Sequence, residues 1–412
     1  MKKPWLAIIL LILLCAAGFI LISNCGGAQL IKTTEETSKG WQLVGEREVS
    51  SYEVYFTGIS LFVYHGTPYI AYNGSHLSTI IGPNVAKYNG TTWESVGDLS
   101  FPIGFITNRI AGSAALFVDN GVPYLACIQP FIIGTDPKGS PITEMMSCVL
   151  KNNGLTWEAV GGSIFTAGVA DYIPLYVYNG TPYVAYSDPA QAGKVAVVKF
   201  NGSNWETVGP TGFALAGPTD VGMLTGVALC VYNATPYIAF KDAANGNRAS
   251  VMKFNGSDWE NVGTPGFSSG EAAHISFTVN NTVPYIAFED KSEYQDKRGV
   301  TQETYTTTVM RFNGASWERV GDPGISYEQA EALSLSVYNG IPYIVYEDME
   351  VPSIGAASLK RFNGTDWEYI GGRGFTFGHA AMYTTLFIDN GIPFIAYRDG
   401  TSGKLTVMKY IE

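Results

Sequence analysis

Residues 89–97 read Asn-Gly-Thr-Thr-Trp-Glu-Ser-Val-Gly, and variants of this stretch recur along the chain. Apart from Trp5, every tryptophan opens a Trp-x-x-(Val/Ile)-Gly pattern, at Trp41, Trp93, Trp157, Trp205, Trp259, Trp317 and Trp367. Seven Pro-aromatic pairs alternate with these tryptophans, at Pro68-Tyr69, Pro123-Tyr124, Pro182-Tyr183, Pro236-Tyr237, Pro284-Tyr285, Pro342-Tyr343 and Pro393-Phe394. The tryptophans are 48 to 64 residues apart. Two independent markers in strict alternation indicate an internal repeat, and such a repeat decides the whole fold.

One repeat unit shows its strands directly. Residues 333–338 alternate between apolar and polar side chains, as a half-buried strand does. The Asn-Gly pairs at 339–340 and 363–364 supply the positive φ angles of tight hairpin turns. The predicted strands, called a to d in chain order, are 333–338, 342–346, 358–362 and one that begins at Trp367. Four antiparallel strands repeated radially form the blades of a β-propeller.

The two ends of the chain predict how the ring closes. The last unit stops after a c strand at 404–410, and an additional Trp strand at 40–45 precedes the first unit. We therefore predict an all-β, seven-bladed propeller in which the N-terminal strand completes the last blade and removes an open sheet edge. Because one unit cannot bury both of its faces alone, we expect the tryptophans to fill the wedges between neighbouring blades.

The repeat also carries a resemblance to known proteins. The blocks Asn-Gly-x-x-Trp-Glu-x-Val-Gly and Pro-Tyr-x-Ala-Tyr-x-Asp resemble propeller repeats of bacterial and archaeal surface and secreted proteins. The turns at 89–93 and 153–157 also resemble the second half of the Asp-box of sialidases and related propellers, but the Ser-x-Asp first half is missing from every copy. The resemblance covers residues 41–412 and implies the architecture, not an activity.

The charge of the chain argues against a nucleic-acid partner. The formal net charge is −11, and no basic run occurs. Binding to nucleic acid depends largely on cations that neutralise phosphates, so we exclude this class of partner. We expect a monomer.

The N-terminal segment predicts export. Two lysines precede an apolar run at 5–23, which is the arrangement of a signal peptide. Residues 21–25 resemble a bacterial lipobox in which Cys25 would be lipidated, although Asn24 stands where a small residue is usual. Because the apolar run approaches the length of a membrane span, an uncleaved anchor and plain secretion stay open beside the lipoprotein. We divide the chain into a signal or anchor (1–25), a linker (26–40) and the propeller (41–412), which each of the three alternatives places outside the cytoplasm.

Strand order assigns the connections to two faces. The Asn-Gly turns lie on one face, and the b–c and d–a connections lie on the other, here called the loop-bearing face. From the proline marker to the next tryptophan there are 23 to 25 residues in most blades, but 34 in blade 2 and 33 in blade 5. We expect long b–c loops at 129–144 and 291–304, where function concentrates on a rigid scaffold. The alternative is that these two longer loops are additions to the surface that have no function.

Carboxylates recur at the ends of the b strands. They are Asp188, Asp242, Asp290, Asp348 and Asp399, with Asn73 assigned to this position in blade 1 and Gln129 in blade 2. Such a ring could bind a ligand or hold Ca²⁺, which needs several oxygens around one centre; no other cofactor is expected. The alternative is that each side chain caps its own turn by accepting backbone N–H groups. Neighbouring strand residues point to opposite faces, so Glu289-Asp290 and Glu347-Asp348 are not acid/base pairs.

Two histidines and two cysteines complete the candidates. His274 and His379 lie in d–a segments near the expected channel entrance, where they could line a ligand or metal site. Cys127 ends one strand and Cys148 lies in the neighbouring strand, so they could form a disulfide in an oxidising compartment. We expect Cys230 to be a small core residue.

Two classes of function remain open. The first is a non-catalytic surface module that binds a glycan, a peptide or a protein through the loop-bearing face. The second is a sialidase-like or polysaccharide-cleaving hydrolase, which the partial Asp-box suggests. The resemblance to sialidases would imply six blades and a cluster of three arginines that binds a carboxylate. The repeat in this sequence instead predicts seven blades. Fold alone decides neither class; convergence of titratable side chains in one pocket of that face would favour an enzyme.

Overall fold

The computed structural model describes most of the chain, and the statements below concern that part. The described residues are 19–22, 29–32, 39–54, 58–76, 79–97, 114–161, 173–188, 191–217, 227–295, 298, 301–321, 325–326, 330, 332–349, 355–376 and 379–412. Trp41–Tyr410 form one compact unit, and residues 1–40 with 411–412 are assigned to a second. In the second unit, β1 (Phe19–Ile22) pairs antiparallel with β2 (Gln29–Lys32). Among the described residues, no helix combines the length and apolarity needed to span a bilayer.

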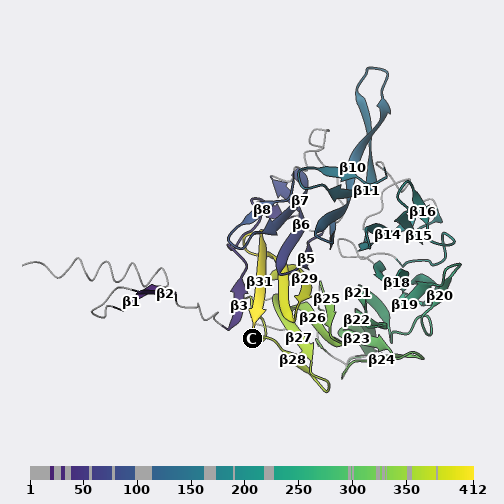
Figure 1. The fold of residues 1–412 in the computed structure, drawn as a ribbon. Helices are drawn as coiled ribbons and strands as arrows, with labels where there is room; N and C mark the ends of the chain where they lie inside the picture. Colours follow the sequence, from purple (N-terminus) through teal and green to yellow (C-terminus); the bar gives the residue numbers. More distant parts are fainter. Residues whose placement is uncertain are drawn as a thin grey trace, which may run out of the picture. The chain divides into compact units, whose positions relative to one another are not determined.

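The larger unit is a ring of seven antiparallel sheets (Figure 1). Blade 1 contains β5 (Ser60–Tyr64), β6 (Thr67–His76), β7 (Thr79–Tyr88) and β8 (Trp93–Ser95), with the short β4 (Glu53–Val54) beside β6. Blade 2 contains β9 (Ala115–Asp119), β10 (Val122–Thr135), β11 (Pro141–Asn152) and β12 (Trp157–Ala159). Blade 3 contains β13 (Leu175–Tyr178), β14 (Thr181–Asp188), β15 (Lys194–Phe200) and β16 (Trp205–Thr207). Blade 4 contains β17 (Val227–Tyr232), β18 (Thr235–Asp242), β19 (Arg248–Phe254) and β20 (Trp259–Asn261).

The remaining blades repeat this order. Blade 5 contains β21 (Glu271–Asn280), β22 (Val283–Gln295), β23 (Thr301–Phe312) and β24 (Trp317–Arg319). Blade 6 contains β25 (Ser334–Tyr338), β26 (Ile341–Asp348), β27 (Ala356–Phe362) and β28 (Trp367–Tyr369). Blade 7 contains β29 (Ala381–Asp389), β30 (Ile392–Asp399), β31 (Leu405–Ile411) and β3 (Gly40–Leu43). The predicted fold class is confirmed.

Blade 7 also confirms the predicted closure. Its sheet order is β29-β30-β31-β3, so the strand that contains Trp41 pairs with the last strand of the chain. The N–H of Val44 donates to the carbonyl of Val407 at 2.9 Å, and that of Val49 donates to Leu405 at 2.7 Å. The two ends of the propeller therefore share one sheet, which leaves no open blade edge at the junction.

The repeated tryptophans link each blade to the one before it. In all seven copies the indole Nε1–H donates to the carbonyl of the Val or Ile in the preceding Trp-x-x-(Val/Ile)-Gly pattern, at 2.6 to 3.3 Å. The pairs are Trp41–Ile370, Trp93–Val44, Trp157–Val96, Trp205–Val160, Trp259–Val208, Trp317–Val262 and Trp367–Val320. An indole has one donor, which needs a partner when the ring packs inside a protein. The predicted position of the tryptophans between blades is thus confirmed.

The hydrophobic core lies between the blades. One apolar cluster joins blades 2 and 3, for example through Tyr124 and Val198, and another joins blades 6 and 7 through Tyr343 and Met408. The b strands contribute fully buried isoleucines at 70, 238, 286, 344 and 395. Alternation along each strand sends apolar side chains to both neighbouring blades, as a radial stack of sheets requires.

Two segments differ from the sequence-based expectation. Residues 129–144 and 291–304 are not open loops, because most of their residues pair within the hairpins β10–β11 and β22–β23. The pairing extends to Thr135–Pro141 in blade 2 and to Gln295–Thr301 in blade 5. Figure 1 shows β10 and β11 projecting from the ring. Longer sequence between the markers therefore lengthens the strands, because a hairpin satisfies its own backbone hydrogen bonds.

Candidate functional site

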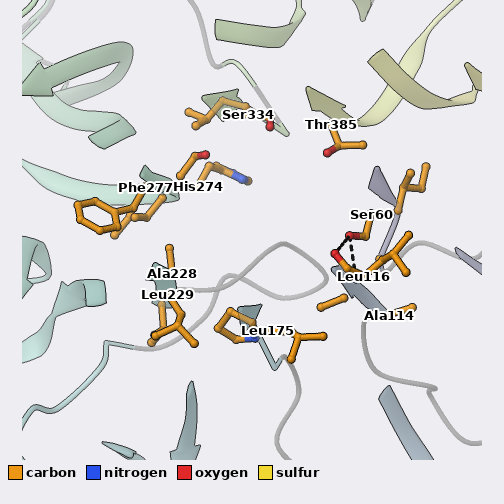
Figure 2. Close-up of a pocket in the computed structure, with 18 of the residues that line it drawn as sticks. Ser60, Ala114, Leu116, Leu175, Ala228, Leu229, His274, Phe277, Ser334 and Thr385 are labelled. Carbon is orange, nitrogen blue, oxygen red and sulfur yellow. Dashed lines mark hydrogen bonds between the residues drawn. The ribbon is translucent and has the colours of Figure 1, made fainter. Parts of the chain in front are cut away.

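A cavity of about 240 Å³ lies at the N-terminal ends of the a strands, the innermost strands of the blades (Figure 2). It is lined by residues of all seven a strands or of the segments that lead into them, including Ser60, Leu116, Leu175 and Ala228. Because strand a is entered from the d–a segment, the cavity belongs to the loop-bearing face. We call it the channel mouth. Most of its wall residues belong to strands of the closed ring.

Hydroxyl groups from neighbouring blades surround part of the channel mouth. Ser60, Ser276, Ser334 and Thr385 occupy equivalent positions at the inner strands of blades 1, 5, 6 and 7. Ser276 Oγ accepts the N–H of Leu335 at 3.0 Å, and Ser334 Oγ accepts that of Leu386 at 3.1 Å. These bonds join adjacent blades and use the hydroxyls as acceptors. The O–H of each remains able to donate to a ligand in the cavity.

His274 lies in the wall of the channel mouth (Figure 2). It is 9% exposed and has a φ of 49°, within an irregularity of the β21–β22 ladder between Ala273 and Ser276. Its Nε2 is 3.7 Å from Oε2 of Glu289, which is fully buried and also accepts the N–H of Ala330. The sequence placed His274 near the channel entrance without indicating its carboxylate neighbour.

Two of the b-strand aspartates accept hydrogen bonds from their own turns. Asp242 accepts the N–H of Ala244 at 3.0 Å and the hydroxyl of Ser250 at 2.6 Å. Asp399 accepts the N–H groups of Thr401 at 2.8 Å and Ser402 at 3.1 Å. This is the capping geometry that the sequence offered as an alternative to a ligand site.

The other three aspartates accept hydrogen bonds from different groups, which are not backbone N–H groups of their own turns. Asp290 accepts the N–H of Gly270 at 2.6 Å, Asp348 accepts the Ser358 hydroxyl at 2.8 Å, and Asp188 accepts the Gln191 amide at 3.3 Å. No aspartate is among the described residues that line the channel mouth. Within the described part of the chain, no group of three or more His, Cys, Asp or Glu residues is arranged to hold a metal ion.

The assignment of Asn73 to the set of residues that end the b strands is wrong. The position that Asp188 occupies in blade 3 is held in blade 1 by Gly74 and not by Asn73. Strand pairing fixes the register, because Ala71 pairs with Val85 as Ala185 pairs with Val197. Asp188 follows Ala185 by three residues, and the residue three after Ala71 is Gly74. Because neighbouring strand residues face opposite ways, Asn73 belongs to the other face of its blade. For Gln129 only the backbone pairing with Met146 is described.

Basic side chains beside the aspartates were not predicted. Arg373 binds Asp348 in a bidentate pair, with Nε–Oδ2 and Nη2–Oδ1 both at 2.8 Å. Beside Asp399, the Nη1 of Arg47 lies 3.7 Å and the Nδ1 of His379 lies 3.2 Å from Oδ2. Arg47, Arg373 and His379 are 34 to 41% exposed. Both arginines stand six residues after a tryptophan marker, which is the signal that could have found them.

The predicted cysteine pair is brought together. Cys127 and Cys148 are directly opposed in β10 and β11, both are buried, and their sulfurs are 3.6 Å apart as free thiols. Cys25 lies outside the described residues. Cys230 is buried in β17, and burial raises the pKa of its thiol to about 11, which keeps it unreactive.

Because a disulfide needs the two sulfurs at about 2.05 Å, a small approach of the strands would close this pair. In protein exported to an oxidising compartment, non-reducing peptide mapping should recover Cys127 and Cys148 as one linked peptide. Reduction should then lower the free energy of unfolding by about 2–4 kcal/mol. The Cys148→Ser variant, which cannot form the bond, should show no effect of reduction; recovery of Cys127 and Cys148 only as free thiols would contradict the prediction.

The fold and this site define the class of the protein as a seven-bladed β-propeller with a cavity at one channel mouth. No protein-family model matches the chain, and no curated protein sequence does. Among solved structures, the polysaccharide lyase Uly1 aligns with a TM-score of 0.55 and 11% identity over 86% of this chain and 90% of its own. An ulvan lyase bound to -[GlcA(1-4)Rha3S]- aligns with a TM-score of 0.53 and 13% identity over 89% and 94%. The SapL1 lectin in complex with alpha methyl fucoside aligns with a TM-score of 0.47 and 14% identity over 77% and 96%. At these identities the likeness shows the propeller fold.

Proposed function

We propose that this chain is an exported, non-catalytic propeller that binds a glycan at the channel mouth of its loop-bearing face. The observation that carries the proposal is the contrast between two groups of residues. Hydroxyls of four blades line one part of the cavity, whereas the aspartates of the same face bond to backbone N–H groups, hydroxyls and basic side chains outside it. Among the described residues, hydroxyl groups without a converging carboxylate pair favour binding over catalysis.

The chemistry of the channel mouth matches a saccharide. Sugar hydroxyls both donate and accept, and the Ser276 and Ser334 hydroxyls can donate to them while neighbouring alanines and leucines contact C–H groups. The partly exposed Arg47 and Arg373 lie on the same face, each beside an aspartate, and a guanidinium has five N–H donors with which to bind sugar oxygens. Two of the aligned structures are polysaccharide lyases, one of them bound to -[GlcA(1-4)Rha3S]-, so the fold is compatible with a polysaccharide ligand.

The hydrolase alternative has less support from the geometry. Glycoside hydrolysis needs two carboxyl groups about 5 to 10 Å apart around one bond. Among the described residues, Glu289 lies beside the channel mouth through its contact with His274, and it is fully buried against His274 and the Ala330 N–H. Arg373 is paired with Asp348 in blade 6 and Arg47 with Asp399 in blade 7, so these two arginines do not share one partner as a sialidase-like cluster would.

Export is the second part of the proposal. The two lysines and the apolar run at 5–23 support passage across a membrane. Lipidation at Cys25, an uncleaved anchor or release would each leave the propeller outside the cytoplasm, where polysaccharides of surfaces and surroundings are available to it.

A bulky side chain in the channel mouth should test the site. Ala228 lines the cavity at a position equivalent to Ser276, and the Ala228→Trp change should fill it. For the full chain, the tightest ligand on a glycan array should bind Ala228→Trp at least tenfold more weakly in calorimetry, about 1.4 kcal/mol. Leu155→Trp is the matched control, because Leu155 is 81% exposed on a distant turn. Unchanged binding by Ala228→Trp would exclude this site, and release of reducing or unsaturated sugars from polysaccharides would show an enzyme.

A further inference from the structure

Two cavities outside the channel mouth have the same construction. One, of about 410 Å³, lies between blades 4 and 5; the other, of about 500 Å³, lies between blades 7 and 1. We call them seam pocket 4/5 and seam pocket 7/1. Twelve residues line each pocket, and the two sets correspond position by position in the repeat. Both volumes fall within the roughly 300–1,000 Å³ that is typical of small-molecule sites.

Each seam pocket has a polar side formed by strands c and d of one blade. In seam pocket 4/5, Arg311 Nε donates to Glu318 Oε1 at 2.7 Å, and Asn313 Nδ2 donates to Glu318 Oε2 at 3.1 Å. These two donors hold the pKa of Glu318 below its ordinary value, so the carboxylate is ionised at neutral pH. An anionic acceptor and two kinds of donor thus stand side by side at the protein surface.

Seam pocket 7/1 repeats this arrangement. Lys87 Nζ lies 3.2 Å from Glu94 Oε1, and Asn89 Nδ2 donates to Glu94 Oε2 at 3.2 Å. The same two neighbours lower the pKa of Glu94. The Lys87 and Glu94 side chains are 39% and 44% exposed, so solvent and ligands can reach them.

Each seam pocket is also lined by apolar and aromatic side chains. Phe312 in one pocket and Tyr88 in the other are half-buried rings at equivalent positions, each packed against the marker tryptophan of its blade at 5.6 Å between centroids. Pro284 and Pro68 also correspond. A pyranose ring has a C–H face and a rim of hydroxyls that donate and accept, and each pocket offers a partner for both.

We propose that seam pockets 4/5 and 7/1 are two equivalent saccharide-binding sites, each of which takes one sugar residue and makes the propeller bivalent. This goes beyond the proposed channel-mouth site, which uses different residues on the loop-bearing face. Two linked sites on one rigid ring raise the apparent affinity for a polymer without any new contact in either site.

The two sites differ in charge. In seam pocket 4/5 the basic residue from the preceding blade, Lys253, is paired with Glu260 at 3.2 Å. Its counterpart in seam pocket 7/1 is Lys409, and β3 has Gln42 where the other blades have that glutamate. No acidic side chain of the described chain forms an ion pair with Lys409. Seam pocket 7/1 therefore holds one additional positive charge and should prefer a sugar with a carboxylate or sulfate.

Calorimetry with two small probes tests this arrangement. With the channel mouth filled by Ala228→Trp, the full-length chain should bind two molecules of methyl β-glucoside and two of methyl β-glucuronide, with the glucuronide tighter at one of the two sites. Glu94→Gln and Glu318→Gln should each remove one site, and the double variant should weaken both by at least tenfold. Lys409→Ala should abolish the preference for glucuronide. Glu206→Gln is the matched control, since the exposed Lys199–Glu206 pair at 3.4 Å lies at a seam to which we assign no site.

The variants separate this inference from the proposed function. Binding that Ala228→Trp removes and the double glutamine variant retains would overturn the seam sites and leave the channel mouth standing. The reverse result would support the seam sites and exclude the channel mouth. Failure of both probes to bind at millimolar concentration, or a loss in Glu206→Gln equal to that in Glu94→Gln, would also overturn the seam sites. Unchanged thermal unfolding of each variant shows that the fold is intact.

Discussion

Replacement of Trp41 by alanine should lower the free energy of unfolding by about 3 kcal/mol, because it removes a large ring from the closing seam. The Trp41 ring stacks on Phe375 at 3.8 Å between centroids and meets Tyr410 edge-on at 5.3 Å. Its Nε1–H also donates to the carbonyl of Ile370 at 3.3 Å. Urea unfolding followed by circular dichroism would measure the change.

Trp41 holds the strand that joins both ends of the ring, so its loss should also have a local effect. The amide of Val44, which donates to Val407, should exchange with solvent faster in Trp41→Ala than amides of blade 4 do. Leu43→Ala is the matched control on the same strand, since Leu43 is 39% exposed and should cost little. Equal effects of the two substitutions would show that the tryptophan does not secure the closure.

The glycine that ends the Trp-x-x-Val-Gly pattern should be almost as sensitive. Gly209 has a φ of +73°, and a Cβ added there would lie 2.5 Å from Cε2 of Phe254 in the next blade. A left-handed backbone costs an ordinary residue about 1–2 kcal/mol, and overpacking adds about 1–3 kcal/mol. We expect Gly209→Ala to lower the free energy of unfolding by about 2–4 kcal/mol in the same urea titration.

A glycine in a turn separates the two costs. Gly202 has a φ of +98°, and a Cβ added there would meet no atom within 4 Å. Gly202→Ala should therefore show the backbone cost alone, and the difference from Gly209→Ala measures the packing of Phe254 against the seam. If the free energy of unfolding falls equally in both variants, the Phe254 ring moves aside without cost. The motif glycine would then be required only for its backbone conformation.

The fold was predictable because its signals are local and repeated. Each Asn-Gly turn, each Pro-aromatic strand start and each tryptophan is set by residues close in sequence, and the unmatched strand at Trp41 implied a circle. The lengths of the b–c hairpins were not predictable in the same way. Residues 129–144 contain a turn signal at 136–139, but the sequence did not indicate that backbone pairing between β10 and β11 would continue almost to Asp136.

The candidate site depended on contacts between distant residues. The sequence named His274 and the b-strand aspartates but gave no sign of Glu289 beside His274 or of the Arg373–Asp348 pair, which spans 25 residues. The shift from Asn73 to Gly74 needed the strand register. No single blade contains a seam pocket, because its two walls come from neighbouring repeats.

The amino-acid sequence by itself determined the all-β class, seven blades of four strands and the closure of the ring, since these follow from turn chemistry and from the period of two markers. Only the tertiary structure decided which polar side chains stabilise turns and which face a cavity. The physical reason is that burial and hydrogen bonding are properties of the packed ring. An aspartate at a given repeat position caps a turn where backbone N–H groups lie within hydrogen-bond distance of its carboxylate, and can bind a ligand where they do not.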